Sequence, residues 1–327
     1  MEVICKRYAN HNTTALPPLP IAMIKLTNKV TLRHLQAFAT LSGTNSFSKA
    51  AEQLSVTQPA LSASIKQLEN QLGTKLFDRT THQIALTAQG AVVLEYAKHL
   101  LNTATNTFDD IRHAIGTGRH RVRIGAIPSA VTLTAAVIAR YNEAHDEHVE
   151  ILLSDMPNDA LLSSLHTGKL DFCVGIKPPD SMSLDTVTLF EDELVLIVSK
   201  QHPLSDAKEV HWRQMAGEEI VMFAQGSVWE FASAALLQHG LAASRRYQMV
   251  HSESLYGVVR SGIAIGIMPS LYTSYLRDDT LHVAPLRFPT LKRKIVLMRR
   301  NEVSRSKWTD HCFRELRNDL KQANHWF

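Results

Sequence analysis

The feature that most constrains this chain is a stretch without proline from residue 88 to residue 115. Apolar side chains recur along it at alternating spacings of three and four, which is a heptad stripe sustained for three repeats. They are Leu94, Ala97, Leu101, Ala104, Phe108, Ile111 and Ile115. A helix with so narrow a seam, placed between two domains, pairs with a copy of itself or packs on its own domain. The pattern favours self-pairing and therefore a dimer.

The long helix separates a short basic part from a larger neutral part. At 327 residues the chain is longer than one core usually organises, so two or three domains are expected. Residues 24–90 hold seven Lys or Arg and three Asp or Glu, whereas residues 119–327 hold 24 of each sign. A basic head on a neutral body is typical of a protein that binds nucleic acid with one domain.

Two short amphipathic helices are expected in the basic part, after a first helix at residues 32–41 that Gly43 ends. Ser46 can cap the second helix, which runs to about residue 54. The third begins with Thr57 or Gln58 as its cap, tolerates Pro59 in its first turn, and closes before residue 73. Short strands at residues 76–77 and 84–86 would surround a polar tip. This order predicts a helix-turn-helix followed by a wing.

Beyond the long helix, which a glycine-rich hinge at residues 116–118 ends, predicted strands alternate with predicted helices. We expect strands at residues 122–127, 149–153, 172–176, 194–198, 220–223, 263–268 and 295–298. Helices are expected at residues 129–143, 158–167, 229–239, 254–261 and 306–322. Such alternation predicts an α/β domain with parallel strands.

Several classes of protein are disfavoured. The chain has no apolar run long enough for a membrane span and no export signal, so we expect a cytoplasmic protein without a membrane partner. Cys5, Cys173 and Cys312 are far apart and lack a CxxC spacing, which predicts reduced structural thiols. The first 22 residues are expected to form a loose tail, with Met23 as an alternative start.

The sequence gives no sign of catalysis. It has neither a GxSxG elbow nor a P-loop. Its tightest histidine cluster, at residues 145–148, lacks the spacing of HExxH, so a solvated turn is favoured over a metal site. We therefore expect no catalytic residue, no metal and no cofactor.

A dense series of motifs runs through the basic part: Leu35-Gln36-Ala37-Phe38, Ser46-Phe47-Ser48-Lys49-Ala50-Ala51, Leu54-Ser55-Val56-Thr57-Gln58-Pro59-Ala60-Leu61-Ser62, Ile65, Leu68-Glu69, Leu72-Gly73, Leu76-Phe77-Asp78-Arg79 and Leu86-Thr87-Ala88-Gln89-Gly90. With these motifs the chain resembles the LysR-type transcriptional regulators, and the resemblance extends over everything after about residue 24. The N-terminal tail departs from the family pattern.

The resemblance implies an α+β fold in three parts after a disordered tail at residues 1–23. These are a winged helix-turn-helix DNA-binding domain at residues 24–88, a dimerising coiled-coil linker helix at 89–117, and an effector-binding domain at 118–327. The last would be a two-lobed α/β domain resembling type 2 periplasmic binding proteins, with lobe I at 118–198 and 287–327 and lobe II at 199–286. Family members commonly assemble as tetramers, in effect dimers of dimers.

DNA contacts are expected on the outer side of the third helix. The resemblance places base contacts at Gln58, Pro59 and Ser62, and a Gln side chain can bind adenine bidentately. Candidates for phosphate contact are Arg33, Ser55, Thr57, Ser64 and Lys66. Arg79 could enter the minor groove from the wing. The structural alternative is that Thr57 and Gln58 only cap the helix.

An effector site is expected where the first strand of the body ends and a helix begins. Free backbone N–H groups at Pro128-Ser129-Ala130 would suit an acidic small molecule, unless Ser129 is only a helix cap. The resemblance adds residues from three other places: Val198, Ser199, Phe223, Gly226, Ser227, His251 and Ser252.

The function expected from the resemblance is effector-responsive binding to promoter DNA that recruits or blocks RNA polymerase. A second hypothesis is an enzyme or transport-type binding protein that the head merely tethers, which turnover of metabolites would support. A third is a nucleoid-type structural protein, which loss of sequence preference would mark.

Overall fold

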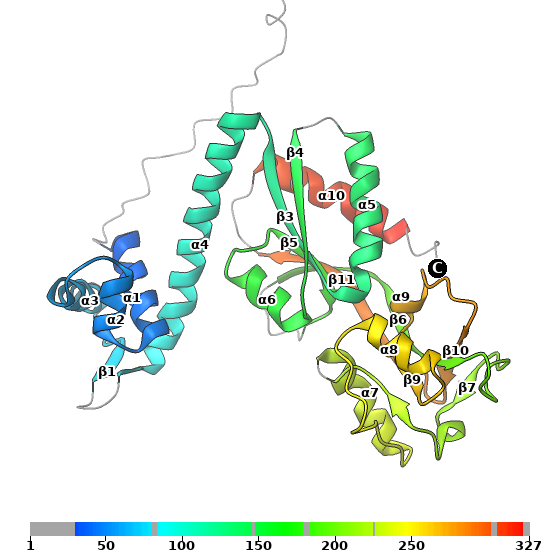
Figure 1. Ribbon diagram of the computed structural model, residues 1–327. Helices are drawn as coiled ribbons and strands as arrows, with labels where there is room; N and C mark the ends of the chain where they lie inside the picture. The colour runs from blue at the N-terminus through cyan, green and yellow to red at the C-terminus, as the bar shows by residue number, and fades with distance from the viewer. Residues whose placement is uncertain are drawn as a thin grey trace, which may run out of the picture. The chain divides into compact units, whose positions relative to one another are not determined.

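The computed structural model describes residues 30–79, 84–145, 148–178, 184–224, 226–301 and 306–322. The chain divides into two compact units between Ala97 and Lys98, within the long helix α4 (Ala88–Thr117). The tail expected at residues 1–23 and the wing tip at residues 80–83 lie outside the described residues. Figure 1 shows the elements of each unit.

The first unit consists of three packed helices and a small antiparallel hairpin. They are α1 (Leu32–Thr44), α2 (Phe47–Gln53), α3 (Gln58–Leu72), β1 (Phe77–Arg79) and β2 (Ile84–Leu86). The ring of Phe38 in α1 packs edge-on against Phe77 of β1, with 5.4 Å between centroids. Both side chains are buried, so the hairpin is fixed to the helices by the core of the unit. This is the winged helix-turn-helix that the sequence predicts.

Local sequence sets the ends of these helices. Ser46 caps α2 and Thr57 caps α3, each accepting a hydrogen bond from the backbone N–H three residues further on. Gly73 ends α3 in the left-handed conformation, with φ of 68°. The predicted end of α1 at Gly43 is wrong, because α1 continues for another residue until Asn45 adopts the left-handed conformation. Asparagine tolerates that conformation better than most residues because its short amide can hydrogen-bond locally.

The C-terminal half of α4 packs on the second unit through polar side chains. Nδ2 of Asn102 donates to the carbonyl oxygen of Thr167 at 3.0 Å, and Nδ2 of Asn106 donates to that of Gly168 at 2.7 Å. The C-terminal part of the apolar seam of the same helix remains uncovered in a single chain, whereas Ala97 of the seam is buried. Phe108, Ile111 and Ile115 keep 58%, 48% and 82% of their surface exposed.

The first lobe of the second unit has three parallel strands and an antiparallel neighbour. In spatial order these are β4 (Val149–Asp155), β3 (His120–Ala126), β5 (Phe172–Ile176) and β11 (Lys292–Arg300). The expectation of parallel strands is wrong for β11, since the chain returns to this lobe from its far end and enters the sheet in the opposite direction.

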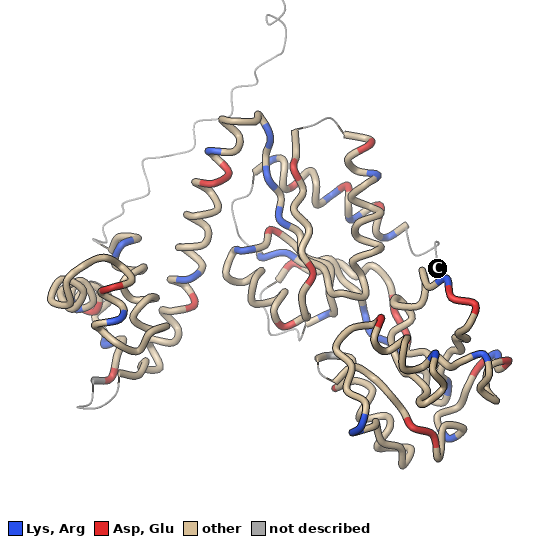
Figure 2. Tube along the Cα trace, viewed as in Figure 1, with Lys and Arg blue, Asp and Glu red and all other residues tan. Residues whose placement is uncertain are grey.

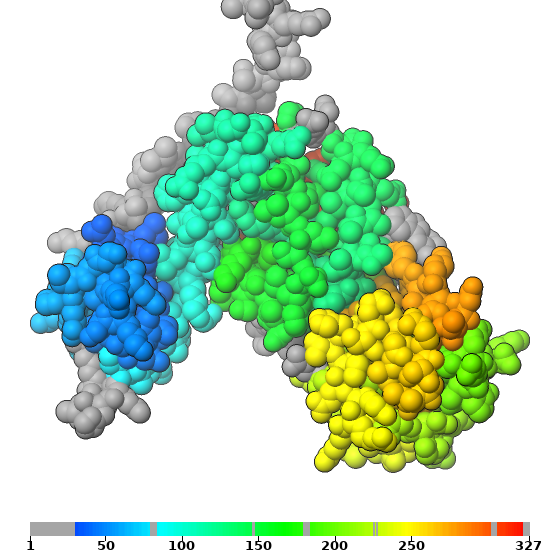
Figure 3. Space-filling model, in the orientation of Figure 1, coloured from blue at the N-terminus to red at the C-terminus, as the bar shows by residue number. Residues whose placement is uncertain are grey.

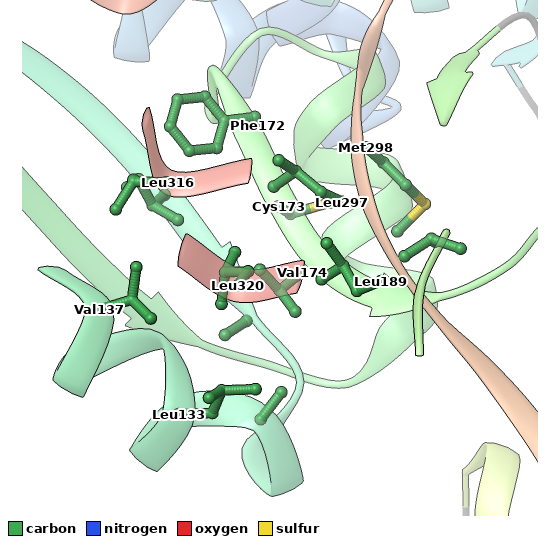
Figure 4. Packing of buried hydrophobic residues seen from close by; sticks show 14 of the residues in the cluster. Leu133, Val137, Phe172, Cys173, Val174, Leu189, Leu297, Met298, Leu316 and Leu320 are labelled. Carbon is green, nitrogen blue, oxygen red and sulfur yellow. The ribbon is translucent and has the colours of Figure 1, made fainter. Parts of the chain in front are cut away.

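Three helices, α5 (Val131–Ala144), α6 (Asn158–His166) and α10 (Lys307–Gln322), pack on this sheet. A short 3-10 turn, η2 (Pro128–Ala130), precedes α5. Figure 4 shows Leu133 and Val137 of α5 and Leu316 and Leu320 of α10 gathered with residues of the sheet in one apolar core. The predicted helix that starts near residue 129 thus begins with η2 and continues as α5.

One strand, β6 (Leu184–Ser199), belongs to both lobes. Its residues 184–193 pair with β11 of the first lobe, and its residues 194–199 pair with strands of the second. The strand therefore changes partners at Leu194, whereas the sequence put the end of the first lobe at residue 198. The sequence also predicts only the apolar end of this strand, from residue 194, because Asp192 and Glu193 interrupt the hydrophobic pattern.

The second lobe contains the remaining strands and two helices of regular length. They are β7 (Val210–His211), η3 (Trp212–Met215), β8 (Ile220–Val221), α7 (Ser227–Gln238), α8 (Ser252–Arg260), β9 (Ile265–Pro269), α9 (Ser270–Thr273) and β10 (Leu281–Arg287). β9 and β10 pair antiparallel with β6, and two apolar clusters fill this lobe. The sequence did not predict β10. It did predict two helices whose bounds lie close to those of α7 and α8.

Two remaining expectations concern cysteines and membranes. Cys173 and Cys312 are free and buried, and burial raises the pKa of each thiol to about 12, so both remain protonated. Cys5 lies outside the described residues. None of the described helices combines the length and apolar character that crossing a bilayer requires.

Candidate functional site

The outer face of α3 presents the residues expected to contact bases. Leu61, Ile65 and Leu68 turn inward and are almost completely buried. Gln58 and Pro59 are exposed at the start of the helix, and Ser62 is partly exposed one turn later. These three residues therefore lie together on the accessible side of the helix, as the spacing predicts.

Gln58 has a partner that sequence reasoning missed. The Ser48 hydroxyl on α2 donates to Oε1 of Gln58 at 3.3 Å. Because this bond occupies the amide oxygen, the Gln58 amide N–H₂ is directed away from Ser48. The spacing of ten residues gave no signal, since the contact arises only when the two helices pack.

The residues expected to contact phosphate differ in how accessible their side chains are. Arg33, Ser55 and Lys66 are exposed, and Ser55 adopts a positive φ of 53° in the turn between α2 and α3. Thr57 is exposed as well, but its hydroxyl already caps α3. Ser64 Oγ is covered by protein atoms, so a phosphate contact would require it to become exposed. Arg79 lies in β1, next to the wing tip that falls outside the described residues.

A cleft of about 560 Å³ lies between the two lobes of the second unit. In Figure 3 the green atoms of the first lobe and the yellow atoms of the second meet along a narrow boundary. The first lobe supplies Ile127 to Ser129 after β3, and residues 157–160 and 162 at the start of α6. The second supplies the segments around Phe223 and Met249, the first turns of α7, and Tyr272. Arg293 of β11 completes the lining.

Four of the expected effector residues line this cleft: Pro128, Ser129, Phe223 and Gly226. Ala130 and Val198 are fully buried in the apolar cores of the two lobes. Ser199 lies at the end of β6, and its hydroxyl accepts a hydrogen bond from the backbone of Gln201. His251 and Ser252 directly follow the lining residues Met249 and Val250 but are not part of the lining. The side chain of Ser227 is outside the described part of the structure.

The functional residue that sequence reasoning missed is Arg293. Nη2 of Arg293 donates to Ser129 Oγ at 2.9 Å and to Asp192 Oδ2 at 2.6 Å, and Nε donates to the same carboxylate oxygen at 2.8 Å. The side chain of Arg293 is 8% exposed and that of Asp192 is completely buried. Buried charges of this kind persist only when paired and hydrogen-bonded.

Asp192 is itself fixed from both lobes. It is the direct cross-strand neighbour of Arg293 in the pairing of β6 with β11. Its second oxygen, Oδ1, accepts hydrogen bonds from the Ser270 hydroxyl at 2.7 Å and from the backbone N–H of Leu271 at 3.1 Å. The guanidinium group in the cleft is thus held in one orientation.

Aromatic rings form one wall of the cleft. The rings of Phe223 and Tyr272 are 5.0 Å apart between centroids. Burial raises the pKa of the Tyr272 phenol, so it stays neutral at physiological pH. The wall therefore offers apolar surface to a ligand.

No group of three or more His, Cys, Asp or Glu that could hold a metal ion occurs among the described residues. The expected turn at residues 145–148 has its two central residues outside that part of the chain. Charges of both signs are interspersed along the second unit (Figure 2).

Two family models match the chain. The one described as "Bacterial regulatory helix-turn-helix protein, lysR family" matches residues 32–91, which include α1 to β2. The one described as "LysR substrate binding domain" matches residues 116–321, which include the cleft.

Relatives match over most of their own length. The chain is 29% identical over 277 residues to the HTH-type transcriptional regulator CatR of Pseudomonas putida, covering 84% of this chain and 94% of CatR. It is 26% identical over 288 residues to YbhD, an uncharacterized HTH-type transcriptional regulator of Escherichia coli strain K12, covering 86% of this chain and 89% of YbhD.

A solved structure of full-length CbnR complexed with its target DNA has the same fold, with a TM-score of 0.60 and 19% identity. The match covers 89% of this chain and 100% of that one.

Proposed function

Since the chain belongs to the LysR family of transcriptional regulators, we propose that a small molecule in the cleft alters how its first unit binds promoter DNA. The observation that carries the proposal is the order of the two matching domains in one chain, a helix-turn-helix at residues 32–91 and a ligand-binding domain at 116–321. A DNA-reading head joined to a cleft domain has the two distinct sites that ligand-controlled binding requires.

We propose that Gln58, Pro59 and Ser62 contact bases in the major groove, with Gln58 held by Ser48. Arg33, Ser55, Thr57 and Lys66 are proposed to contact phosphate, and Arg79 the minor groove. The exposure of Gln58, Pro59, Arg33, Ser55, Thr57 and Lys66 supports this division. Phosphate contacts give salt-dependent affinity, whereas base contacts give sequence preference.

We propose that α4 pairs with the α4 of a second chain. Its exposed residues Phe108, Ile111 and Ile115 form an apolar stripe that a single chain leaves in water. Covering this stripe by a symmetric copy would remove that unfavourable exposure. Two such dimers would give the tetramer expected of the family.

We propose that the chain regulates transcription in the cytoplasm, by recruiting or blocking RNA polymerase, and does not catalyse a reaction. CatR, a transcriptional regulator by name, supports this assignment. The hydroxyl of Ser129 supports it as well, because its partner in the cleft is a guanidinium group and not a general base that could activate it.

The test is selection of DNA from a random library by the full-length protein, followed by titration of the selected and a scrambled duplex. We expect the selected duplex to bind about 10³-fold or more tightly than the scrambled one at physiological salt. Equal affinity for both would instead support a structural nucleoid protein. Turnover of a metabolite by the same preparation would support an enzyme.

A further inference from the structure

We propose that the cleft binds a zwitterion, a small molecule with a carboxylate and an ammonium group on a partly apolar body. The inference rests on the proposed function of the cleft as the effector site. It narrows the expectation of an acidic effector, because the charges around the cleft do not suit a ligand that carries negative charge alone.

The carboxylate would bind at the buried floor. Three of the five N–H bonds that a guanidinium group offers are used by Asp192 and Ser129, and Nη1 of Arg293 has no hydrogen-bond partner among the described residues. Ser129 Oγ accepts from Arg293, which leaves its own hydroxyl proton free to donate. Arg293 and Ser129 together therefore present unused donors to one acceptor group.

The positive charge at this floor is already offset. Asp192 contacts two nitrogens of Arg293 and is completely buried, so the pair contributes no net charge to the cleft. Its role is to fix the direction of the remaining donors. A single carboxylate can use those donors, but the described lining holds no further cationic side chain for the second carboxylate of a dicarboxylate.

The rim carries the opposite charge. Asp159 of the first lobe and Glu230 of the second both line the cleft and are exposed, in contrast to Arg293. Each lies in the first turn of its helix, α6 or α7. The two helix N-termini would otherwise attract an anion, and these carboxylates offset their dipoles.

The described lining thus has unused hydrogen-bond donors at its buried end and two carboxylates at its solvent end. A ligand with negative charge alone would meet repulsion at the rim, and an amine alone would leave the donors at the floor unused. A zwitterion satisfies both ends. Between them, Phe223 and Tyr272 offer an apolar wall for the body of the ligand.

Two sets of matched probes test this by calorimetry on the full-length protein. The first is L-phenylalanine, 3-phenylpropionate and 2-phenylethylamine, and the second is 6-aminohexanoate, hexanoate and hexylamine. We expect the amino acid of at least one set to bind about tenfold or more tightly than both of its singly charged relatives. Binding of the parent acid as tightly as its amino derivative in both sets, or binding of neither amino acid, would overturn the proposal.

Variants assign the preference to the rim. In the double variant Asp159→Asn and Glu230→Gln, the advantage of the amino acid over its parent acid should fall by about twofold to fivefold, the scale of one exposed ion pair. Glu253→Gln is the matched control, because Glu253 is also exposed in the first turn of a helix of the second lobe, α8, but does not line the cleft. An undiminished preference in the double variant would contradict the proposal.

The DNA assay separates this inference from the proposed function. If a parent acid binds best and changes the affinity for the selected DNA, the regulator stands and the zwitterion is wrong. If the protein has no preference for any selected DNA, the proposed function itself fails, whatever the cleft binds.

Discussion

Oε1 of Glu69, near the end of α3, accepts a hydrogen bond from the backbone N–H of Leu76 at 3.0 Å. The same oxygen accepts from Phe77 N–H at 3.4 Å, and Lys75 Nζ lies 3.2 Å from the other carboxylate oxygen. Burial raises the pKa of Glu69, but these hydrogen bonds outweigh it and hold the pKa below its usual range. One carboxylate therefore joins the DNA-reading helix to the wing.

Glu69→Gln should loosen the wing, because an uncharged amide forms weaker bonds to the two N–H groups. The expected loss is about 1–3 kcal/mol. In the native chain the pKa of Glu69 is lower in the folded state than its ordinary value of about 4.3. The carboxylate therefore stabilises the fold fully above that ordinary value, and this stabilisation is lost as the pH falls through the lowered pKa. Amide exchange at Leu76 and Phe77 should show this loss of protection between pH 7 and acidic pH. In Glu69→Gln the contribution of this carboxylate to the pH dependence disappears, whereas Glu52→Gln, on the exposed side of α2, should behave as the native chain.

Gln58→Ala and Lys66→Ala should differ in kind. Loss of Gln58 should cost roughly 1–3 kcal/mol on the selected duplex and little on scrambled DNA, because it removes a base contact. Loss of Lys66 should weaken binding to both duplexes alike, and it should reduce the slope of log affinity against log salt concentration by about one unit. Titrations at several salt concentrations check this, and the same pattern from both variants would end the distinction.

Ser48→Ala should reduce base preference less than Gln58→Ala does. The variant removes the hydroxyl that fixes the Gln58 amide but leaves the amide in place. The expected cost is about 0.5–1.5 kcal/mol on the selected duplex. Ser48→Thr keeps the donor and should retain most of the preference, whereas an unchanged preference in Ser48→Ala would mean that Gln58 needs no support.

Leu101→Glu with Phe108→Glu should shift the protein toward monomers, because both changes place charge in the apolar seam of α4. Sedimentation velocity measures the shift. The matched control is Val250→Glu, an exposed apolar residue of the second lobe, which should leave the oligomeric state unchanged. A full complement of dimer in the double variant would show that α4 does not form the interface.

Ser129→Ala should weaken the effector response about tenfold or more, because the cleft loses a donor and Arg293 loses one acceptor that orients it. DNA affinity without effector should hardly change, since the mutation alters only the differential affinity of the ligand for two conformations. Effector titrations of DNA binding check both values. Ser154→Ala, an exposed serine of β4, serves as the control, and lost basal binding in Ser129→Ala would indicate a folding defect instead.

Local signals explain what could be predicted from the sequence. Ser46, Thr57 and Gly73 act within three or four residues of their own positions, so their roles as helix ends were readable without a structure. The position of Ser129 was readable for the same reason, since it lies in the short turn that follows the apolar strand β3. The role of Asn45 as the end of α1 was not readable, because Gly43 offered the stronger signal for a helix end two residues earlier.

Long-range contacts explain what could not be predicted. Arg293 is 101 residues from Asp192 and 164 residues from Ser129 in the chain, so no spacing in the sequence connects them. A charged residue within a strand also reads as solvent-facing, and only the sheet pairing shows that Asp192 and Arg293 neutralise each other in the interior. The first half of β6 was missed for this reason.

The shared strand β6 has a mechanical consequence. Because its residues 184–193 are hydrogen-bonded into one lobe and residues 194–199 into the other, the lobes cannot swing about a slack connection there. We expect a rotation that narrows the cleft to be absorbed as extra twist of the strand near Leu194, where its pairing partners change. Such a strand should resist closure elastically and favour the return of the lobes to their original angle.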